Sequence, residues 1–254
     1  MIEAKHIHKS FNSKEVLRDI NAKFNPGRIN FIIGASGSGK SVFMKCLIGL
    51  LKPNQGEIFY NGDDFLQMTE YQKKRLYQQI GVLFQASALF DSFTTQENVA
   101  FPLRFFTDKS KAEVQERVDF CLERVGLTGA HQLLPSELSG GMKKRVGIAR
   151  AIALNPKYLF CDEPNSGLDP QNAILIDNLI RELTVEFNTT TVINSHDMNS
   201  VFEIGDYMIY LHKGDKWWEG HPNNIRDSGN EELYKFVYAS KYLRETYDGD
   251  KKRQ

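Results

Sequence analysis

The sequence predicts an α/β fold built on a mostly parallel β-sheet, with a block of helices inserted into it. Three observations lead to this fold class. Short apolar runs alternate with helical stretches, a glycine-rich loop joins one such run to a helix, and residues from about 94 to 150 look helical. With 254 residues, of which 41% are hydrophobic and 25% charged, the chain can bury a sizeable core.

The N-terminal part of the chain is expected to form the strands of an antiparallel β subdomain. Residues 2–11 are rich in β-forming side chains, and residues 16–24 partly alternate between apolar and polar side chains. Pro26 and Gly27 form a turn into residues 29–33, a short apolar run typical of a fully buried parallel strand. The next expected elements are a helix at residues 41–51 and a strand at residues 56–60 that ends in the turn Asn61-Gly62.

The middle of the chain carries two helix-start signals. Thr94 with Glu97, and Ser110 with Glu113, each fit the capping box in which a hydroxyl and a carboxylate satisfy backbone N–H groups reciprocally. After the second signal, apolar residues recur at helical spacing and would form one face of a helix: Val114, Val118, Cys121, Leu122 and Val125. We therefore expect a helical subdomain over residues 94–150, inserted into the α/β core.

The alternation of strand and helix returns after this insertion, as a parallel sheet with helices on its faces requires. The expected elements are a strand at 158–161, a helix at 171–187, a strand at 190–194, a short helix after Asp197, and a strand at 207–211. We expect a single domain over residues 1–247 and a charged tail at 248–254. A C-terminal helix is expected within 223–242, and Trp217-Trp218 in a late strand with one ring buried.

Composition limits the classes of partner. Lys and Arg together number 32, as do Asp and Glu, so no basic excess favours nucleic acid. Cys46, Cys121 and Cys161 stand among apolar neighbours, which indicates buried free thiols in a reducing compartment. The first residues lack the pattern of a signal peptide, and the most apolar helical stretch is too short to cross a bilayer. We expect a cytoplasmic protein that reaches a membrane only through a partner.

A glycine-rich loop follows the buried run at residues 29–33. It matches G-x-x-x-x-G-K-[ST] in full, with these residues: Gly34, Ala35, Ser36, Gly37, Ser38, Gly39, Lys40 and Ser41. Glycines let successive backbone N–H groups point at phosphate oxygens, and the helix that begins near Lys40 adds its positive end. Lys40 can then reach the β- and γ-phosphates, and the Ser41 hydroxyl can bind Mg²⁺. The strand and helix on either side make a chance Gly/Ser turn a poor explanation.

An acidic pair ends the strand predicted at residues 158–161. Asp162 stands where Mg²⁺ needs a second protein contact, and Glu163 can act as general base toward the attacking water. Acidic pairs at strand ends are common, so the pair carries weight only together with the phosphate loop. The two motifs predict hydrolysis of a nucleoside triphosphate.

The run Leu138-Ser-Gly-Gly-Met decides among phosphate-loop ATPases. Ser139 can cap a helix that begins at Gly141, and the paired glycines Gly140 and Gly141 expose backbone N–H groups as a second anion site. Because one phosphate loop is already present, a second phosphate-binding helix start indicates contact with a neighbouring chain's nucleotide. In this motif, and along nearly its whole length, the chain resembles the ABC ATPases.

The remaining motifs of that family occur in order along the chain. By the resemblance, Phe11 stacks on adenine, Gln85 is the Q-loop glutamine that also approaches Mg²⁺, Asp169 is the D-loop aspartate and His196 the switch histidine. Each of these residues alone is more often structural. The resemblance implies a homodimer with two sandwiched ATP molecules, each held by Lys40 and Ser41 of one chain and by the Ser139–Met142 run of the other.

A finer resemblance concerns the ATPases of bacterial Mla and MCE lipid-transport systems. It rests on the runs LFQASALFDSFTTQENVAFPL and PSELSGGMKKRVGIARAIA, with Met142 where most ABC ATPases have Gln and with Ala88-Leu89-Phe90 after Gln85. Met142 could equally be a neutral substitution, and Leu89, Phe90 and Phe93 the core of the helical subdomain. The resemblance implies a permease that docks near Gln85 and transports phospholipid; import or export of a polar solute is the alternative.

Functions outside transport fit the sequence less well. ATPases of DNA repair and chromosome organisation have long coiled coils between the phosphate loop and the LSGG run, and this chain has no sustained heptads there. Soluble regulators and translation factors of the superfamily join two ATPase units in one chain. A GTPase would need an N-K-x-D motif. Because Glu163 and His196 are both present, a catalytically inactive module is not expected.

Overall fold

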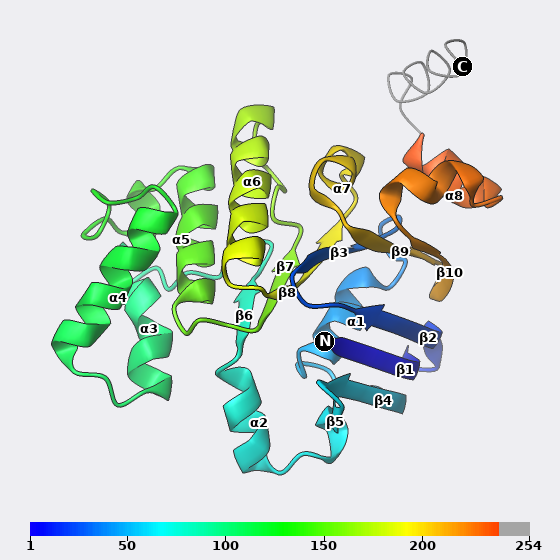
Figure 1. The fold of residues 1–254 in the computed structure, drawn as a ribbon, viewed down its shortest axis with the longest axis horizontal. Coiled ribbons are helices and arrows are strands. Elements are labelled where there is room, and N and C mark those ends of the chain that lie inside the picture. Colours follow the sequence, from blue (N-terminus) through cyan, green and yellow to red (C-terminus); the bar gives the residue numbers. More distant parts are fainter. Residues whose placement is uncertain (239–254) are drawn as a thin grey trace.

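The computed structural model describes residues 1–238, which form two β-sheets flanked by helices (Figure 1). The larger sheet has the strand order β10-β9-β3-β8-β7-β6. All its neighbouring strands pair in parallel except the β9–β10 hairpin. Its strands are β3 (Arg28–Ile33), β6 (Ile80–Leu83), β7 (Tyr158–Asp162), β8 (Thr190–Ser195), β9 (Tyr207–His212) and β10 (Asp215–Gly220). The predicted α/β fold class is confirmed.

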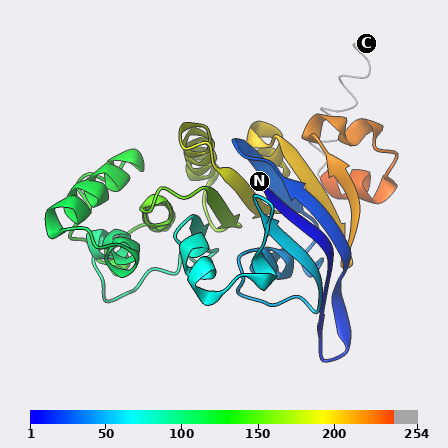
Figure 2. The same ribbon diagram turned by 60° about the horizontal axis from the view of Figure 1, so that its bottom comes forward.

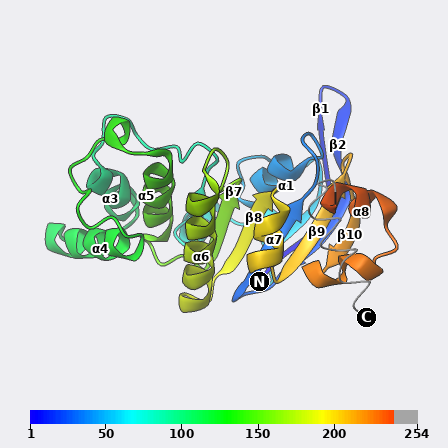
Figure 3. The same cartoon turned by 90° about the horizontal axis from the view of Figure 1, so that it is seen from above.

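Alternate residues of the central strands face opposite sides of this sheet, as the strand period of two requires. Phe31 and Ile193 belong to a core that the helices α5 (Gly140–Ile152), α6 (Pro170–Glu186) and α7 (Met198–Ile204) cover. Ile32 and Val192 belong to a second core, shared with the helix α1 (Lys40–Leu47) and the smaller sheet. Figure 3 shows α6 and α7 lying side by side across one face.

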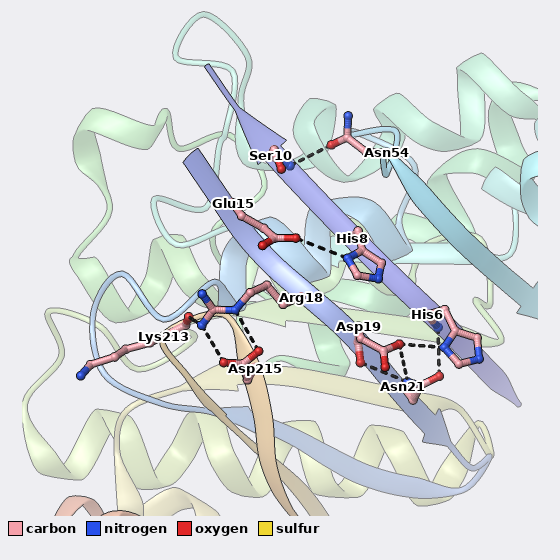
Figure 4. Close-up of polar contacts among 10 residues, drawn as sticks. All are labelled: His6, His8, Ser10, Glu15, Arg18, Asp19, Asn21, Asn54, Lys213 and Asp215. Atoms are coloured by element: carbon pink, nitrogen blue, oxygen red, sulfur yellow. Dashed lines mark hydrogen bonds and ion pairs between the residues drawn. The ribbon is translucent and has the colours of Figure 1, made fainter. Parts of the chain in front are cut away.

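The smaller sheet is antiparallel, with the order β2-β1-β4-β5. Its strands are β1 (Ile2–Phe11), β2 (Lys14–Phe24), β4 (Gln55–Tyr60) and β5 (Asp63–Asp64). The β1–β2 hairpin projects from one end of the molecule (Figure 2). Arg18 on β2 anchors it to the larger sheet, because its guanidinium donates to Asp215 Oδ1 at 2.9 Å and to the Lys213 carbonyl at 2.5 Å (Figure 4). The sheet that carries Phe11 is thereby tied to the sheet that carries the glycine-rich loop.

Three helices lie at the opposite end of the molecule (Figure 3): α3 (Thr95–Phe106), α4 (Lys111–Arg124) and α5. Both capping boxes form as predicted. Thr94 accepts from the Glu97 N–H while the Glu97 carboxylate accepts from the Thr94 N–H, and Ser110 pairs with Glu113 in the same way. The apolar face predicted for α4 is buried in the core that α5 also covers.

Several element boundaries differ from the expectation. The helix α1 ends at Leu47 instead of residue 51, because Gly49 adopts a φ of 82° and reverses the chain. The expected C-terminal helix is instead a 3₁₀-helix, Pro222–Asp227, followed by α8, Glu231–Val237. Gly229, with a φ of 63°, separates the two. The end of the expected helix and the tail at 248–254 lie outside the described residues.

Two short helices escape prediction for a simple reason. The helix α2 (Glu70–Tyr77) has Leu76 as its one buried residue, and a 3₁₀-helix at Phe65–Gln67 has Phe65, so neither has apolar periodicity. The late strand is confirmed as β10, where Trp218 is half-buried against the core and Trp217 is exposed. All three cysteines are free and buried, as expected. No helix within residues 1–238 is both long and apolar enough to cross a membrane.

Candidate functional site

The glycine-rich loop connects β3 to α1 and depends on its glycines. Gly34 has a φ of 152°, and a Cβ on it would lie 2.3 Å from the Leu211 carbonyl oxygen. Gly39, with a φ of 107°, stands at the N-cap of α1 without a side-chain cap. The first N–H groups of α1 therefore have no side-chain acceptor at the N-cap. This is typical of a helix start that binds an anion.

Lys40 is held inside this loop. Its side chain is buried, and Nζ donates to the carbonyl oxygens of Gly34 at 2.8 Å and Ala35 at 3.2 Å. Burial lowers the pKa of Lys40, and the nearby carboxylates of Glu163 and Asp162 partly oppose that effect. The cation is therefore pre-positioned within the loop and has carbonyl contacts that a phosphate group can replace.

Two oxygen ligands for a divalent cation meet at the start of α1 and the end of β7. Ser41 Oγ lies 3.4 Å from Asp162 Oδ1. Asn194 on β8 donates to the same carboxylate oxygen at 2.9 Å and so fixes its position. No cluster of three or more His, Cys, Asp or Glu side chains suited to a metal occurs within residues 1–238. A hydroxyl, a carboxylate and phosphate oxygens are the ligand set that Mg²⁺ uses at nucleotide sites, and the two protein ligands fit it.

Glu163 and His196 contact each other across the ends of two neighbouring strands. His196 Nδ1 lies 2.8 Å from Glu163 Oε2, and the carboxylate is 14% exposed while the imidazole is 66% exposed. Glu163 adopts a φ of 48°, an uncommon conformation for a residue with a side chain. Its backbone N–H donates to the Asn194 carbonyl at 3.0 Å, which holds this conformation. A partly shielded carboxylate paired with a histidine suits a general base.

These groups surround a single cavity of about 710 Å³. The residues that line it are Val16, Ala35, Ser36, Gly37, Gly39, Lys40, Ser41, Val42, Gln85, Glu163, His196 and Phe236. Most of them belong to the predicted phosphate loop or to the predicted catalytic set. Gly34 and Ser38 are buried within the loop itself. Asp162 does not line the cavity, but its Oδ1 lies 3.4 Å from Ser41 Oγ, and Ser41 does line it.

Three lining residues were not anticipated. Val16 and Val42 carry no chemical signal, so nothing in the sequence distinguishes them from core residues. Phe236 comes from α8, whose Leu233 and Val237 are buried in the larger core. Its place in the cavity depends on how the C-terminal segment folds back, which periodicity does not reveal.

Phe11 is not among the residues that line this cavity in the described part of the chain. It ends β1, is 42% exposed, and has the Lys9 ammonium 5.1 Å from its ring centroid. Its proposed contact with adenine therefore stays a prediction.

The LSGG run and Asp169 lie next to each other and away from the cavity-lining set of the described residues. Ser139 caps α5 by accepting from the Met142 N–H at 3.2 Å. Asp169 caps α6 by accepting from the Asn172 N–H at 3.0 Å. A Cβ on Gly141 would lie 2.9 Å from Asn172 Oδ1, so the two helix starts need the glycine to approach this closely. None of the residues 139–142 lines the cavity among the described residues.

The segment after β6 is held by two basic residues of α5 that sequence reasoning missed. Lys144 is buried and donates to the carbonyl oxygens of Gln85 and Glu163. Arg150 donates to the carbonyl oxygens of Ser87 and Ala88, at 2.6 and 2.8 Å. Burial lowers the pKa of both basic groups. The side chain of Gln85 reaches Ser166 Oγ at 3.3 Å. One helix thus contacts the Q-loop segment and the loop of the candidate base.

An aromatic patch continues from this segment onto α3. Its rings are in mutual contact at centroid distances between 4.9 and 6.3 Å and belong to Phe90, Phe93, Phe101, Phe105 and Phe106. Phe90, Phe101 and Phe105 are 41%, 38% and 66% exposed, whereas Leu89 packs against the core. We call these five residues the aromatic patch. Contiguous exposed apolar surface of this kind marks an interaction site.

The fold and the cavity define a phosphate-loop nucleotide-binding protein, and comparison with known proteins assigns its family. The model of the ABC transporter family matches residues 17–166, and the chain belongs to that family. The chain is 40% identical over 210 residues to the probable ribonucleotide transport ATP-binding protein mkl of Mycobacterium leprae, covering 83% of this chain and 60% of that protein. The mycobacterial relatives are thus considerably longer than the matched segment.

Two further relatives carry different names. The intermembrane phospholipid transport system ATP-binding protein MlaF of Haemophilus influenzae is 36% identical, covering 93% of this chain and 90% of its own length. The methionine import ATP-binding protein MetN of Desulfitobacterium hafniense is 39% identical, covering 84% and 64%. Among solved structures, dimeric MJ0796 bound to ADP and Pi is 31% identical with a TM-score of 0.79, covering 87% of this chain and 99% of that one.

Proposed function

We propose that the chain binds and hydrolyses ATP as a subunit of a membrane transporter. The observation that carries the proposal is one cavity in which Lys40, the Ser41–Asp162 pair and the Glu163–His196 pair converge. ATP hydrolysis needs a cradle for phosphates, ligands for a divalent cation and a base for water, and these three elements supply them.

Each residue has a separate task in this proposal. The loop N–H groups and Lys40 hold the phosphates, Ser41 and Asp162 hold Mg²⁺ with the help of Gln85, and Glu163 accepts the proton of the attacking water. When bound, Mg²⁺ neutralises charge that develops on the β- and γ-phosphates. His196 keeps the Glu163 carboxylate oriented, because its Nδ1 lies 2.8 Å from one of the two carboxylate oxygens.

The proposal includes a homodimer. Ser139 and Gly141 start α5 beside Asp169 and contribute no lining to the chain's own cavity among the described residues. A second copy placed head to tail would bring this run over the nucleotide held by Lys40. The solved MJ0796 structure described above is a dimer, which supports a dimeric state for this chain.

Replacement of Lys40 tests the proposal. Lys40→Ala should lower kcat/KM for ATP by roughly 10²–10³-fold, the range for loss of one preorganised donor at a developing charge. Lys45→Ala is the matched control, because Lys45 lies exposed on the same helix. Steady-state phosphate release by the purified chain gives both values. Equal activity of the two variants would contradict the proposed role of the cavity.

We further propose a permease that docks on the aromatic patch and transports a lipid. An amphipathic helix of the permease would cover the exposed rings in the helix-in-groove manner, and Lys144 and Arg150 connect that surface to the Glu163 loop. The near full-length match to MlaF supports a lipid cargo, and the names of mkl and MetN keep a polar solute as the alternative. In this arrangement the chain meets the cytoplasmic face of a membrane only through the permease.

A further inference from the structure

A cluster of three hydrogen-bonded side chains lies behind the Glu163 loop and the His196 turn. Asp177, in the middle of α6, accepts from Asn165 Nδ2 at 2.8 Å through one carboxylate oxygen and from Ser200 Oγ at 2.7 Å through the other. Asn165 Nδ2 also donates to Ser200 Oγ at 2.9 Å, which closes the triangle. None of the three residues belongs to the motifs of the nucleotide site.

Each member of the triangle comes from a different segment. Asn165 follows Glu163 by two residues in a loop without regular structure, and Ser200 lies in the first turn of α7, shortly after His196. Asp177 belongs to the longest helix of the described chain, which Ile176 and Ile180 fix in the core. The triangle therefore joins the Glu163 loop and the first turn of α7 to the longest helix.

Asp177 is buried, which makes its two donors necessary. Asp177 as a residue is 6% exposed, and burial raises the pKa of its carboxyl group, as do the neighbouring carboxylates of Asp197 and Glu203. The hydrogen bonds from Ser200 and Asn165 act in the opposite direction, because they stabilise the ionised form. The two hydrogen bonds fix the position of the buried Asp177 carboxylate, and the carboxylate in turn fixes the side chains of Asn165 and Ser200.

Two more features concern the Asn165 side chain and the space beside it. Asn165 Oδ1 is buried and has no hydrogen-bond partner within residues 1–238, so its amide is oriented entirely by the donors that face Asp177 and Ser200. A cavity of about 440 Å³, lined by all three residues and by Leu168, lies beside the triangle. Without the hydrogen bonds, the loop would have space into which it could move.

We propose that Asp177 is a positioning residue that holds Glu163 and His196 in register through Asn165 and Ser200. The proposal rests on the ATPase function proposed above and adds Asp177, Asn165 and Ser200 to the residues on which hydrolysis depends. The 2.8 Å contact between Glu163 and His196 bridges the two segments that the triangle ties together, so loosening either segment would disturb that contact. A base displaced by about 1 Å loses much of its effect on the reaction.

The test exchanges the carboxylate and the amide. In Asp177→Asn, one of the two acceptor oxygens becomes an NH2 group, so either Asn165 or Ser200 loses its acceptor whichever way the new amide turns. The kcat for ATP hydrolysis should fall at least tenfold, while the Kd for ATP, measured with a fluorescent ATP analogue, stays within twofold. In the double variant Asn165→Asp with Asp177→Asn, the acid accepts from the new amide and from Ser200. Its kcat should return to within threefold of the parent value.

Asn178→Ala, on the same helix and at the same cavity, is the matched control and should keep the parent kcat. A parent kcat in Asp177→Asn, or a double variant as slow as the single one, would overturn the positioning role. If Asp177→Asn does not fold, the double variant alone decides, since its kcat must still approach that of the parent. A parent chain that hydrolyses no ATP would instead contradict the proposed function.

Discussion

At the scale of single residues, the sequence predicts which side chains bind phosphate and Mg²⁺, but it does not predict the backbone conformations that place them. The glycine pattern and Lys40 identify the phosphate loop because only that spacing lets the loop wrap closely. The same reasoning could not foresee that Glu163 adopts a φ of 48° or that Lys144 donates to its carbonyl oxygen. Both depend on contacts between segments far apart in the chain, which a local motif does not record.

Phe11 provides a test at this scale. Phe11→Ala should weaken ATP binding by about 1–3 kcal/mol, the range for bases that stack on aromatic side chains, and discrimination among nucleotide bases should fall. Its ring is 42% exposed, so removing it leaves no buried cavity and the fold should survive. Equilibrium titration with ATP and GTP measures both effects. An unchanged affinity for ATP would identify Phe11 as a surface residue without a role in binding.

At the scale of elements, prediction succeeds where a pattern is long and fails where an element buries little. Strands at 29–33 and 190–194 and the face of α4 follow from runs of apolar residues. The helix α2, with Leu76 as its one buried side chain, leaves no such trace. The C-terminal helix was predicted as one piece because Gly229 alone does not reveal the break between the 3₁₀-helix and α8.

The helix α5 links the Q-loop to the catalytic loop, and Arg150 tests that link. Ser87 and Ala88 have φ values of 60° and 46°, and each residue in this conformation costs roughly 1–2 kcal/mol, which the Arg150 guanidinium offsets by donating to both carbonyl oxygens. Arg150→Lys removes the fork geometry and keeps the charge. Hydrolysis by the free chain should change less than twofold, whereas stimulation by the permease should fall several-fold in the reconstituted complex. Equal stimulation of variant and parent would contradict the link.

At the scale of the whole molecule, two surfaces at opposite ends of α5 serve two proposed partners. The start of α5 is the surface proposed for a second copy of the chain, and the aromatic patch beside the Q-loop is the surface proposed for a permease. The composition of the chain predicts neither surface, because its 32 basic and 32 acidic residues balance. It only disfavours nucleic acid as a partner. Sequence motifs located the first surface, and the packing of α3 was needed to define the second.

One set of experiments tests both the aromatic patch as the docking surface for the permease and phospholipid as the cargo of the transporter. Phe105→Asp, at the most exposed ring of the patch, should reduce co-purification of the permease at least tenfold, and Tyr71→Asp, at an exposed aromatic on α2, should not. The intact complex should carry phospholipid, and added phospholipid should change its ATPase rate. A complex that responds to methionine or to ribonucleotides and carries no phospholipid would contradict the lipid cargo while leaving the ATPase in place.

The measurement that tests the central claim most directly is the mass of Glu163→Gln in the presence of ATP and Mg²⁺. The glutamine cannot accept the proton of water, so hydrolysis should fall by about 10²–10⁴-fold while ATP still binds. By light scattering, the 29.1 kDa chain should then double in mass and return to the monomer when ATP is removed. Hydrolysis near the parent rate, or an ATP-bound chain that stays monomeric, would contradict the account.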